Sequence, residues 1–288
     1  MTFVQTDAPG TSHRWIYRHS VAVRVTHWIN VICLVALFMS GLQIFNAHPA
    51  LYWGEQSDFS APLMDIEATG ASAGDALSGL KATKGVLKIG NREFDTTGWL
   101  GLTSGGDGGL TQRAFPSWIT LPGPQDLATG RRWHFFFAWL FVFNGAVYLI
   151  SGIASGHIRR DLWARRGEWR EIGPSILQHL RLRFPKGDKA RRYNVLQKLT
   201  YLVVIFVLLP VMVLAGMAMS PGLDSLVPGL LSIFGGRQSA RTIHFIAAFG
   251  IVLFSLVHIA MVLLSGVVNN IRSMITGRYD IGRSRGEP

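Results

Sequence analysis

Cysteine is almost absent from this chain of 288 residues, because Cys33 is the only one. A single cysteine excludes an internal disulfide bond, and no Cys-x-x-Cys-His motif is present to attach a c-type haem. The four thiolates that hold an iron–sulfur cluster are also missing. Any redox centre in this chain must therefore be held by histidine or by another ligand that is not a thiolate. Cys33 lies in an apolar run, where a small buried residue is the expected role.

Charged residues are scarce as well, at 16% of the chain, and long apolar runs take their place. Four runs each have the roughly 20 residues that cross about 30 Å of hydrocarbon. They cover residues 25–45, 133–156, 197–219 and 243–268. Pro210 is acceptable in the third run because neighbouring membrane helices can satisfy the carbonyl group that it frees.

The first run starts too far from residue 1 to be a cleaved signal peptide, and no small-residue cleavage site follows it. The sequence therefore predicts an all-α integral membrane protein. We expect one membrane domain over residues 1–288, built as a bundle of four transmembrane helices.

Positive charge predicts how these helices are oriented. In a four-span topology, 19 of the 28 lysines and arginines lie on the side of the two termini, with only 7 of the 17 acidic residues. Many of these basic residues belong to the link over residues 157–196. The positive-inside rule places both termini in the cytoplasm of a bacterium, in its inner membrane. The net charge of +11 is then a topology signal, and nucleic acid is not an expected partner because the basic residues flank apolar spans.

The stretch over residues 46–130 is a long loop that this topology places in the periplasm. A loop of this length in a compact protein usually has a function or is disordered. The segment GVLKIGNREFDTTG has a strand–turn–strand pattern around Gly90-Asn91, and the segments HPALYWG and FPSWITLPGP carry aromatics and prolines that suit an interfacial cap. We expect a docking surface for a redox partner, or a cap over the helix ends, and the two roles are compatible.

Two histidines, His244 and His258, lie fourteen residues apart inside the fourth apolar run. An α-helix turns about 100° and rises about 1.5 Å per residue, so the second histidine returns to nearly the same face about 21 Å further along. Ionisable residues inside a membrane are costly and mark function by default. Two histidines on one face of a helix suit a helix that holds two haems at two depths.

Two further histidines match these depths. His27 lies at the cytoplasmic start of the first span and His134 at the periplasmic start of the second, so depth pairs His27 with His258 and His134 with His244. An iron porphyrin has two axial positions that neutral imidazoles commonly occupy. The alternative for any single site is a hydrogen-bonded histidine between helices. Four histidines that match in depth favour two haems b, each with two histidine ligands to its iron.

Glycines and arginines add to this hypothesis. Gly41 follows His27 by fourteen residues and Gly152 follows His134 by eighteen, so each returns to the face of its histidine, where a missing side chain permits close approach of the second haem. Ordinary packing of small residues is the alternative. Arg132 and Arg241 lie close to ligands and suit the carboxylates of haem propionates, although interfacial arginine is a competing interpretation.

The remaining histidines are weaker candidates. His157 ends the second span near the cytoplasmic pair and could donate to a quinone carbonyl, and His19 is a fainter candidate for the same role. A surface histidine at a helix end is the alternative for both. His48 fits a structural role in the loop, and His13 and His179 fit solvated positions.

The segments RVTHW and RRWHFFFAW and the His-x13-His fourth span resemble the four-helix di-haem cytochrome b subunits of bacterial respiratory enzymes, such as nickel–iron hydrogenases, formate dehydrogenases and thiosulfate reductases. HPALYWG, SGHIRRDLW, YNVLQKLTYL and GGRQSARTIHF look closest to the branch found beside periplasmic molybdopterin oxidoreductases of the sulfite-oxidase type. This resemblance implies the same four ligands, a quinone site near the cytoplasmic haem and a partner enzyme at the periplasmic face. The long first loop departs from the hydrogenase and formate dehydrogenase branches, which leaves the partner's identity open.

The expected function is electron transfer between the quinone pool and a periplasmic redox enzyme, with the chain as the electron-transfer subunit of an oxidoreductase complex. Two alternatives remain. One is a stand-alone quinone-reactive cytochrome b that oxidises superoxide or a small reductant. The other is a redox-inactive membrane anchor or transporter, although transporters tend to show inverted halves with broken helices.

Overall fold

The computed structural model describes residues 2–7, 11–70, 83–104, 109–163, 167–180, 195–227 and 229–280. Residues 164–166 and 181–194 of the basic link, and the glycines at 105, 106 and 108 of the predicted periplasmic loop, lie outside these ranges.

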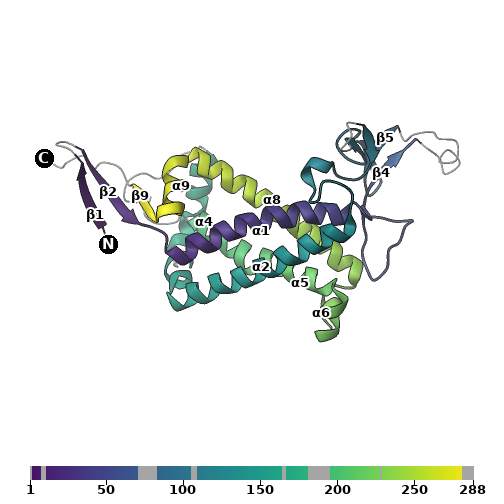
Figure 1. The fold of residues 1–288 in the computed structure, drawn as a ribbon. Coiled ribbons are helices and arrows are strands. Elements are labelled where there is room, and N and C mark those ends of the chain that lie inside the picture. Colours follow the sequence, from purple (N-terminus) through teal and green to yellow (C-terminus); the bar gives the residue numbers. More distant parts are fainter. Residues whose placement is uncertain are drawn as a thin grey trace. The chain divides into compact units, whose positions relative to one another are not determined.

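Among the residues that the structure describes, four helices are long and apolar enough to cross a membrane, which confirms the predicted four-span fold. They are α1 (Val21–Phe45), α2 (Leu127–Ala154), the composite third span (Val195–Ala218) and α8 (Arg237–Leu264) (Figure 1). Large apolar side chains on their outer surfaces are exposed, as expected for helices that face lipid and not water.

The third span changes its winding at one place. Its parts are α4 (Val195–Val203), a π-helical segment (Val204–Leu208) and α5 (Leu209–Ala218). The π-helical segment ends two residues before Pro210, which has no N–H and whose ring conflicts with the carbonyl one turn earlier. A π-bulge is a common way for a helix to absorb such a conflict, so the proline accounts for the local winding.

Short helices connect the spans or, in the case of α9, follow the last one. Those with α-helical winding are α3 (Ile172–Leu180), α6 (Pro221–Leu226), α7 (Leu230–Ile233) and α9 (Val267–Thr276). The others are the 3-10 helices η1 (Ser117–Ile119) and η3 (Glu168–Glu171) and the π-helix η2 (Ile158–Leu162).

Nine short strands are described, all outside the four spans, so the all-α prediction holds for the membrane part of the chain. β1 (Thr2–Asp7), β2 (Thr11–Tyr17) and β9 (Arg278–Asp280) form an antiparallel sheet in the order β1-β2-β9. β3 (Ala50–Leu51), β4 (Met64–Thr69), β5 (Lys84–Ile89) and β6 (Arg92–Asp95) form a second sheet in chain order. β7 (Leu102–Ser104) pairs with β8 (Leu110–Gln112).

The predicted strand–turn–strand segment is the β5–β6 hairpin. Ile89 pairs with Arg92 across the two-residue turn, and Gly90 there has a φ of 54°. A positive φ at this position is easily adopted by glycine, which explains why the Gly-Asn pair places the turn here.

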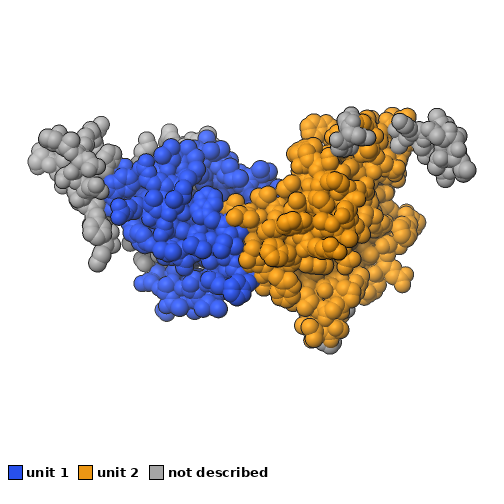
Figure 2. Space-filling view, in the orientation of Figure 1, with its two compact units in different colours: residues 1–29, 143–210, 249–288 blue, residues 30–142, 211–248 orange. Residues whose placement is uncertain are grey.

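The described residues fold into two compact units (Figure 2). Unit 1 consists of residues 1–29, 143–210 and 249–288, and unit 2 consists of residues 30–142 and 211–248. The helices α1, α2 and α8 each contribute residues to both units. The prediction of a single membrane domain stays a prediction.

Unit 2 contains an apolar cluster that joins the long loop to α1. Leu42 and Phe45 of α1 pack with buried side chains of the loop. These are Leu51, Ile66, Ala114 and Phe115. The loop therefore has a core of its own that includes the end of a membrane helix.

The segment HPALYWG also caps the start of α8. The carbonyl of Gly54 accepts hydrogen bonds from the backbone N–H groups of Gln238 (3.0 Å) and Ser239 (3.2 Å), which are among the unpaired donors of a helix N-terminus. A Cβ at Gly236, where φ is +112°, would lie 2.6 Å from the Gly54 carbonyl carbon. This geometry supports the predicted role of the loop as a cap over a helix end.

Candidate haem-binding histidine pairs

Unit 2 brings together His134 on α2 and His244 on α8. Their ring centroids are 6.2 Å apart and their planes are inclined by 67°. Both belong to unit 2, and the fold thus brings together the two histidines that the predicted depths pair.

Hydrogen bonds at Nδ1 orient both of these rings. His244 Nδ1 lies 2.8 Å from the Met212 carbonyl, which can only accept, so Nδ1 carries the hydrogen. Ser40 Oγ donates to the Ala36 carbonyl (2.6 Å) and therefore accepts from His134 Nδ1 at 3.1 Å. In both imidazoles the lone pair is then left on Nε2, the tautomer that a neutral histidine needs to bind a metal through that atom.

Two glycines lie directly against these rings. A Cβ at Gly41 would lie 3.5 Å from His134 Cε1, and a Cβ at Gly216 would lie 3.1 Å from His244 Cε1. Gly41 is a predicted site residue, whereas Gly216 is one that the sequence interpretation missed. The third span carries no histidine, so nothing in the sequence distinguished Gly216 from other small residues of membrane helices.

Unit 1 brings together His27 on α1 and His258 on α8, with ring centroids 6.4 Å apart and planes inclined by 57°. Aromatic side chains surround this pair. Phe254 stacks on His258 at 5.8 Å, and Trp28 meets His27 edge-on at 5.4 Å. The Nδ1 atom of His27 is buried and has no hydrogen-bond partner among the residues that the structure describes.

The spacing of both pairs fits a metal between two imidazoles. A metal–imidazole bond is about 2 Å long, so two rings on opposite sides of one metal have centres roughly 6 Å apart. The observed 6.2 Å and 6.4 Å match this value. Within the described ranges, no three His, Cys, Asp or Glu side chains converge into a larger cluster. The residues present therefore fit a group that takes two axial ligands, as haem does.

Comparison with known proteins gives the family. Residues 18–277 match the family described as prokaryotic cytochrome b561. The chain belongs to this family. A protein of Azospira oryzae, named as a candidate protein-methionine-sulfoxide reductase subunit, YedZ1, is 28% identical over 259 residues, which cover 90% of this chain and 96% of that protein. No solved structure matches the chain.

Membership of the cytochrome b561 family implies that the chain binds haem b and takes part in electron transport. Together with the four apolar helices, it makes the chain a multi-pass protein of the bacterial inner membrane.

The predicted propionate partners of this cytochrome differ in their surroundings. Arg241 is partly buried, donates to the His48 carbonyl and lies over the Phe45 ring at 5.2 Å. Arg132 is exposed on α2. Arg241 is thus tied to the loop that caps α8, and its role toward a propionate stays a prediction, as does that of Arg132.

Gly152 does not lie against a histidine ring. A Cβ at this position would lie 3.1 Å from the Cδ1 and Cγ1 atoms of Ile158 in η2. Because η2 returns toward the end of α2 after the turn at Gly156, where φ is +68°, it places an isoleucine side chain on this glycine. The small residue accommodates that contact, and a role for Gly152 toward a haem stays a prediction.

The two candidate quinone residues, His19 and His157, lie close enough for their charges to interact. Burial, together with the charges of Arg18, His157 and His27, lowers the pKa of His19 to about 4. His19 Nδ1 is buried and, within the described residues, has no hydrogen-bond partner. The fold thus brings His19 and His157 close to the pair of His27 and His258.

Proposed function

We propose that this cytochrome holds two haems b, one at each histidine pair, and transfers electrons between the quinone pool and a periplasmic oxidoreductase. The observation that carries the proposal is that α8 supplies one histidine to each of two pairs with the spacing of axial ligands. Haem b bound at these sites supplies reversible one-electron oxidation and reduction of its iron.

The protein's own groups fix the ligands in this arrangement. The Met212 carbonyl and the Ser40 hydroxyl hold the Nδ1–H of His244 and His134, so each ring is oriented before the group binds. Gly216 and Gly41 leave room beside the rings. Apolar helices keep water away from the sites, which contributes to the reduction potential.

The Azospira relative favours one direction of electron flow. Its name describes a subunit of a protein-methionine-sulfoxide reductase. Reduction of a sulfoxide to a thioether consumes two electrons and two protons and releases water, and oxidation of one quinol to quinone releases two electrons and two protons. By this relationship the chain would accept electrons from quinol and deliver them to a periplasmic enzyme, which we infer to be of the molybdopterin type.

The quinone is proposed to bind beside the pair of His27 and His258. His19, with a pKa of about 4, is neutral at physiological pH and keeps an N–H that can donate to a quinone carbonyl. His157 lies close enough to lower that pKa by its charge and is proposed as a second donor.

The periplasmic partner is proposed to dock on the loop at residues 46–130. Several large aromatic side chains of this loop are exposed, among them Trp99 at 74% and Trp118 at 67% of their full surface. Exposed tryptophans are the residue type most enriched at the energetic centres of protein interfaces. The loop's packing onto Phe45 makes its removal a poor test, because deletion of residues 60–110 would take Ile66 out of the shared core.

The experiment that tests the proposal is a count of haem per chain, by pyridine haemochrome and by the reduced-minus-oxidised optical spectrum. We expect two b haems in the wild type and one in each of His244→Ala and His258→Ala, because each variant removes one axial ligand of a different pair. His157→Gln is the matched control and keeps two. Full haem content in both alanine variants would refute the ligand assignment, and one haem in the wild type would refute the two-haem proposal.

Quinol oxidation by the purified chain then separates an electron-transfer subunit from a stand-alone enzyme. We expect quinol to reduce the haem in a single phase, without steady-state turnover until the partner is added. Sustained turnover with a small electron acceptor or donor alone would favour the stand-alone alternative.

A further inference from the structure

The helix α9 (Val267–Thr276) has its apolar side outward. Val268 and Ile275 expose 67% and 61% of their surface, and Ile271 between them is also exposed. The polar Ser273 lies on the opposite side of the helix and is buried, with 1% of its surface exposed. Residues at i, i+3/i+4 and i+7 share one face of a helix, so Val268, Ile271 and Ile275 form a continuous stripe. A helix that faces water would present the reverse arrangement.

Hydrogen bonds fix this orientation. Asn269 donates through Nδ2 to the Asp280 carbonyl (2.7 Å) and accepts through Oδ1 from the Asp280 backbone N–H (3.0 Å), which ties α9 to β9. Trp28 Nε1 on α1 donates to the Met274 carbonyl (3.1 Å), and Arg24 donates to the Ile275 carbonyl. The helix therefore cannot turn its apolar face inward without breaking these bonds.

The chain also fixes the depth of α9. Only Ser265 and Gly266 separate it from the end of the membrane helix α8, and Gly266 has a φ of +111° that allows a sharp change of direction. Leu263 and Leu264 at the end of α8 are exposed apolar residues of a membrane span. The apolar stripe of α9 thus begins four residues after Leu264, at the end of a membrane span.

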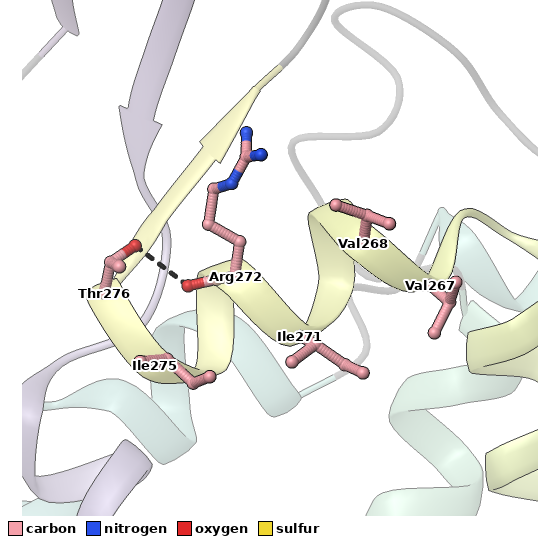
Figure 3. Close-up of a pocket in the computed structure, with 6 residues that line it drawn as sticks. All are labelled: Val267, Val268, Ile271, Arg272, Ile275 and Thr276. Carbon is pink, nitrogen blue, oxygen red and sulfur yellow. Dashed lines mark hydrogen bonds between the residues drawn. The ribbon is translucent and has the colours of Figure 1, made fainter.

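The charge of α9 suits an anionic surface. Its sequence VVNNIRSMIT contains one arginine and no acidic residue. Arg272 lies beside a shallow hollow of about 400 Å³ that it lines together with Val267, Val268, Ile271, Ile275 and Thr276. In Figure 3 the Arg272 side chain extends to the side of α9 opposite Ile271 and Ile275. Its guanidinium group lies 5.3 Å from the centre of the Trp15 ring, so a cation–π contact with β2 positions the charge beside α9.

We propose that α9 lies in the membrane surface on the side of the two termini, with Val268, Ile271 and Ile275 among the acyl chains and Arg272 at the phosphate groups of anionic phospholipids. The apolar stripe supplies the hydrophobic part of the binding and the arginine supplies the electrostatic part, as in other interfacial amphipathic helices. Because α9 accepts hydrogen bonds from Trp28 and Arg24, this lipid contact also supports the segment of α1 that carries His27.

Site-directed labelling of an introduced cysteine tests the depth of the helix in the full-length protein. The native Cys33 has no exposed surface, so the unsubstituted protein serves as the labelling blank. Ile271→Cys, and Arg92→Cys on the exposed strand β6 as the matched control, are labelled with an environment-sensitive fluorophore. The proteins are reconstituted in vesicles of phosphatidylcholine and phosphatidylglycerol.

We expect the probe at position 271 to be quenched by brominated acyl chains and protected from aqueous iodide, and the probe at position 92 to show the reverse. Equal quenching of both probes by iodide would overturn the proposal, because it would place α9 in water. A position-271 probe that is protected from iodide but not quenched by brominated lipid would overturn it as well, because protein and not lipid would then cover the helix.

The electrostatic part has a separate readout. We expect the amount of phosphatidylglycerol that co-purifies with each chain from the mixed vesicles to fall in Arg272→Gln and to persist in Arg272→Lys, because a lysine retains the charge. Arg92→Gln is the matched control and should retain the wild-type amount. Equal retention in the wild type and in Arg272→Gln would show that Arg272 does not bind the phosphate groups.

Discussion

Burial determines the charge of the polar side chains near both ends of the membrane helices. His19, next to α1, is held neutral because its surroundings exclude water and already contain the cation Arg18. Arg113, in the long loop, keeps its charge in a buried position because three oxygen atoms accept its hydrogen bonds. Burial lowers the pKa of both groups, so the weakly basic imidazole of His19 loses its proton, whereas the strongly basic guanidinium of Arg113 keeps its own.

His19 predicts a loss of stability on mild acidification. Its pKa is about 4 in the folded protein and 6.5 when exposed, so the unfolded chain binds the proton more readily. The stability contributed by neutral His19 is therefore fully present above about pH 6.5 and is lost as the pH falls from 6.5 toward 4. In His19→Gln we expect a smaller drop of the melting temperature between pH 7 and pH 5 than in the wild type. Identical drops would show that His19 does not contribute.

Arg113 predicts a cost for removing a buried cation. It exposes 6% of its surface and donates to the Gly123 carbonyl (3.0 Å), Thr120 Oγ1 (2.9 Å) and Gln43 Oε1 (3.4 Å). Arg113→Met would leave these acceptors without their donors, at a cost of about 2 kcal/mol. Thermal unfolding and proteolysis of the loop measure this loss. Arg92→Met, on an exposed strand, is the control, and equal effects of the two substitutions would contradict the assigned role.

At the scale of helices, the four spans differ in what they provide. The spans α1, α2 and α8 carry the histidines, whereas the third span carries none and supplies the Met212 carbonyl and Gly216 to the ring of His244. A helix without histidines thus determines how one of the proposed ligands, His244, is held. The residues that do so are apolar or small, because in a membrane helix the backbone carbonyl is available as an acceptor at any residue type.

Gly216 predicts a site-specific effect of side-chain volume. A Cβ there would lie 3.1 Å from Cε1 and 3.3 Å from Nδ1 of His244, so Gly216→Val forces the ring out of position. We expect haem content to fall from two per chain to about one. Gly145→Val on α2 is the matched control, because no atom lies within 4 Å of its Cβ position. Retention of two haems in Gly216→Val would show that the His244 ring does not need this space.

At the scale of the whole chain, the loop at residues 46–130 adds a folded surface to a membrane cytochrome. Its sheet of β3 to β6 and its core with Phe45 form one unit with the histidine pair His134 and His244. A partner that docks on this loop would therefore contact the unit that contains His134 and His244.

The exposed tryptophans of the loop predict a loss of coupling without a loss of haem. In Trp99→Ala combined with Trp118→Ala we expect reoxidation of the reduced haem by the co-purifying partner enzyme to need roughly tenfold more partner, which corresponds to about 1.4 kcal/mol of binding. Haem content should stay at the wild-type value. Trp169→Ala, an exposed tryptophan of η3 outside the loop, is the control. An unchanged partner requirement in the double variant would place the docking surface elsewhere.

The spans, the β5–β6 turn and the pairing of the histidines could be predicted from the sequence because each depends on a local rule. A membrane span is a run of apolar residues, a turn is a Gly-Asn pair, and the depth of His27 or His134 is its distance from the end of its run. The strands β1, β2 and β9 were not predicted, because their pairing joins the two ends of the chain.

The sequence by itself determined the four membrane spans, the family and which histidines share a depth, because the bilayer acts on each span separately and depth follows from position along the chain. Only the tertiary structure decided that Gly216 and Met212 hold His244, that Gly54 caps α8, that Gly152 lies against Ile158, and that α9 turns its apolar face outward. These features depend on contacts between segments far apart in the chain, and such contacts leave no periodic signal in the residues that make them.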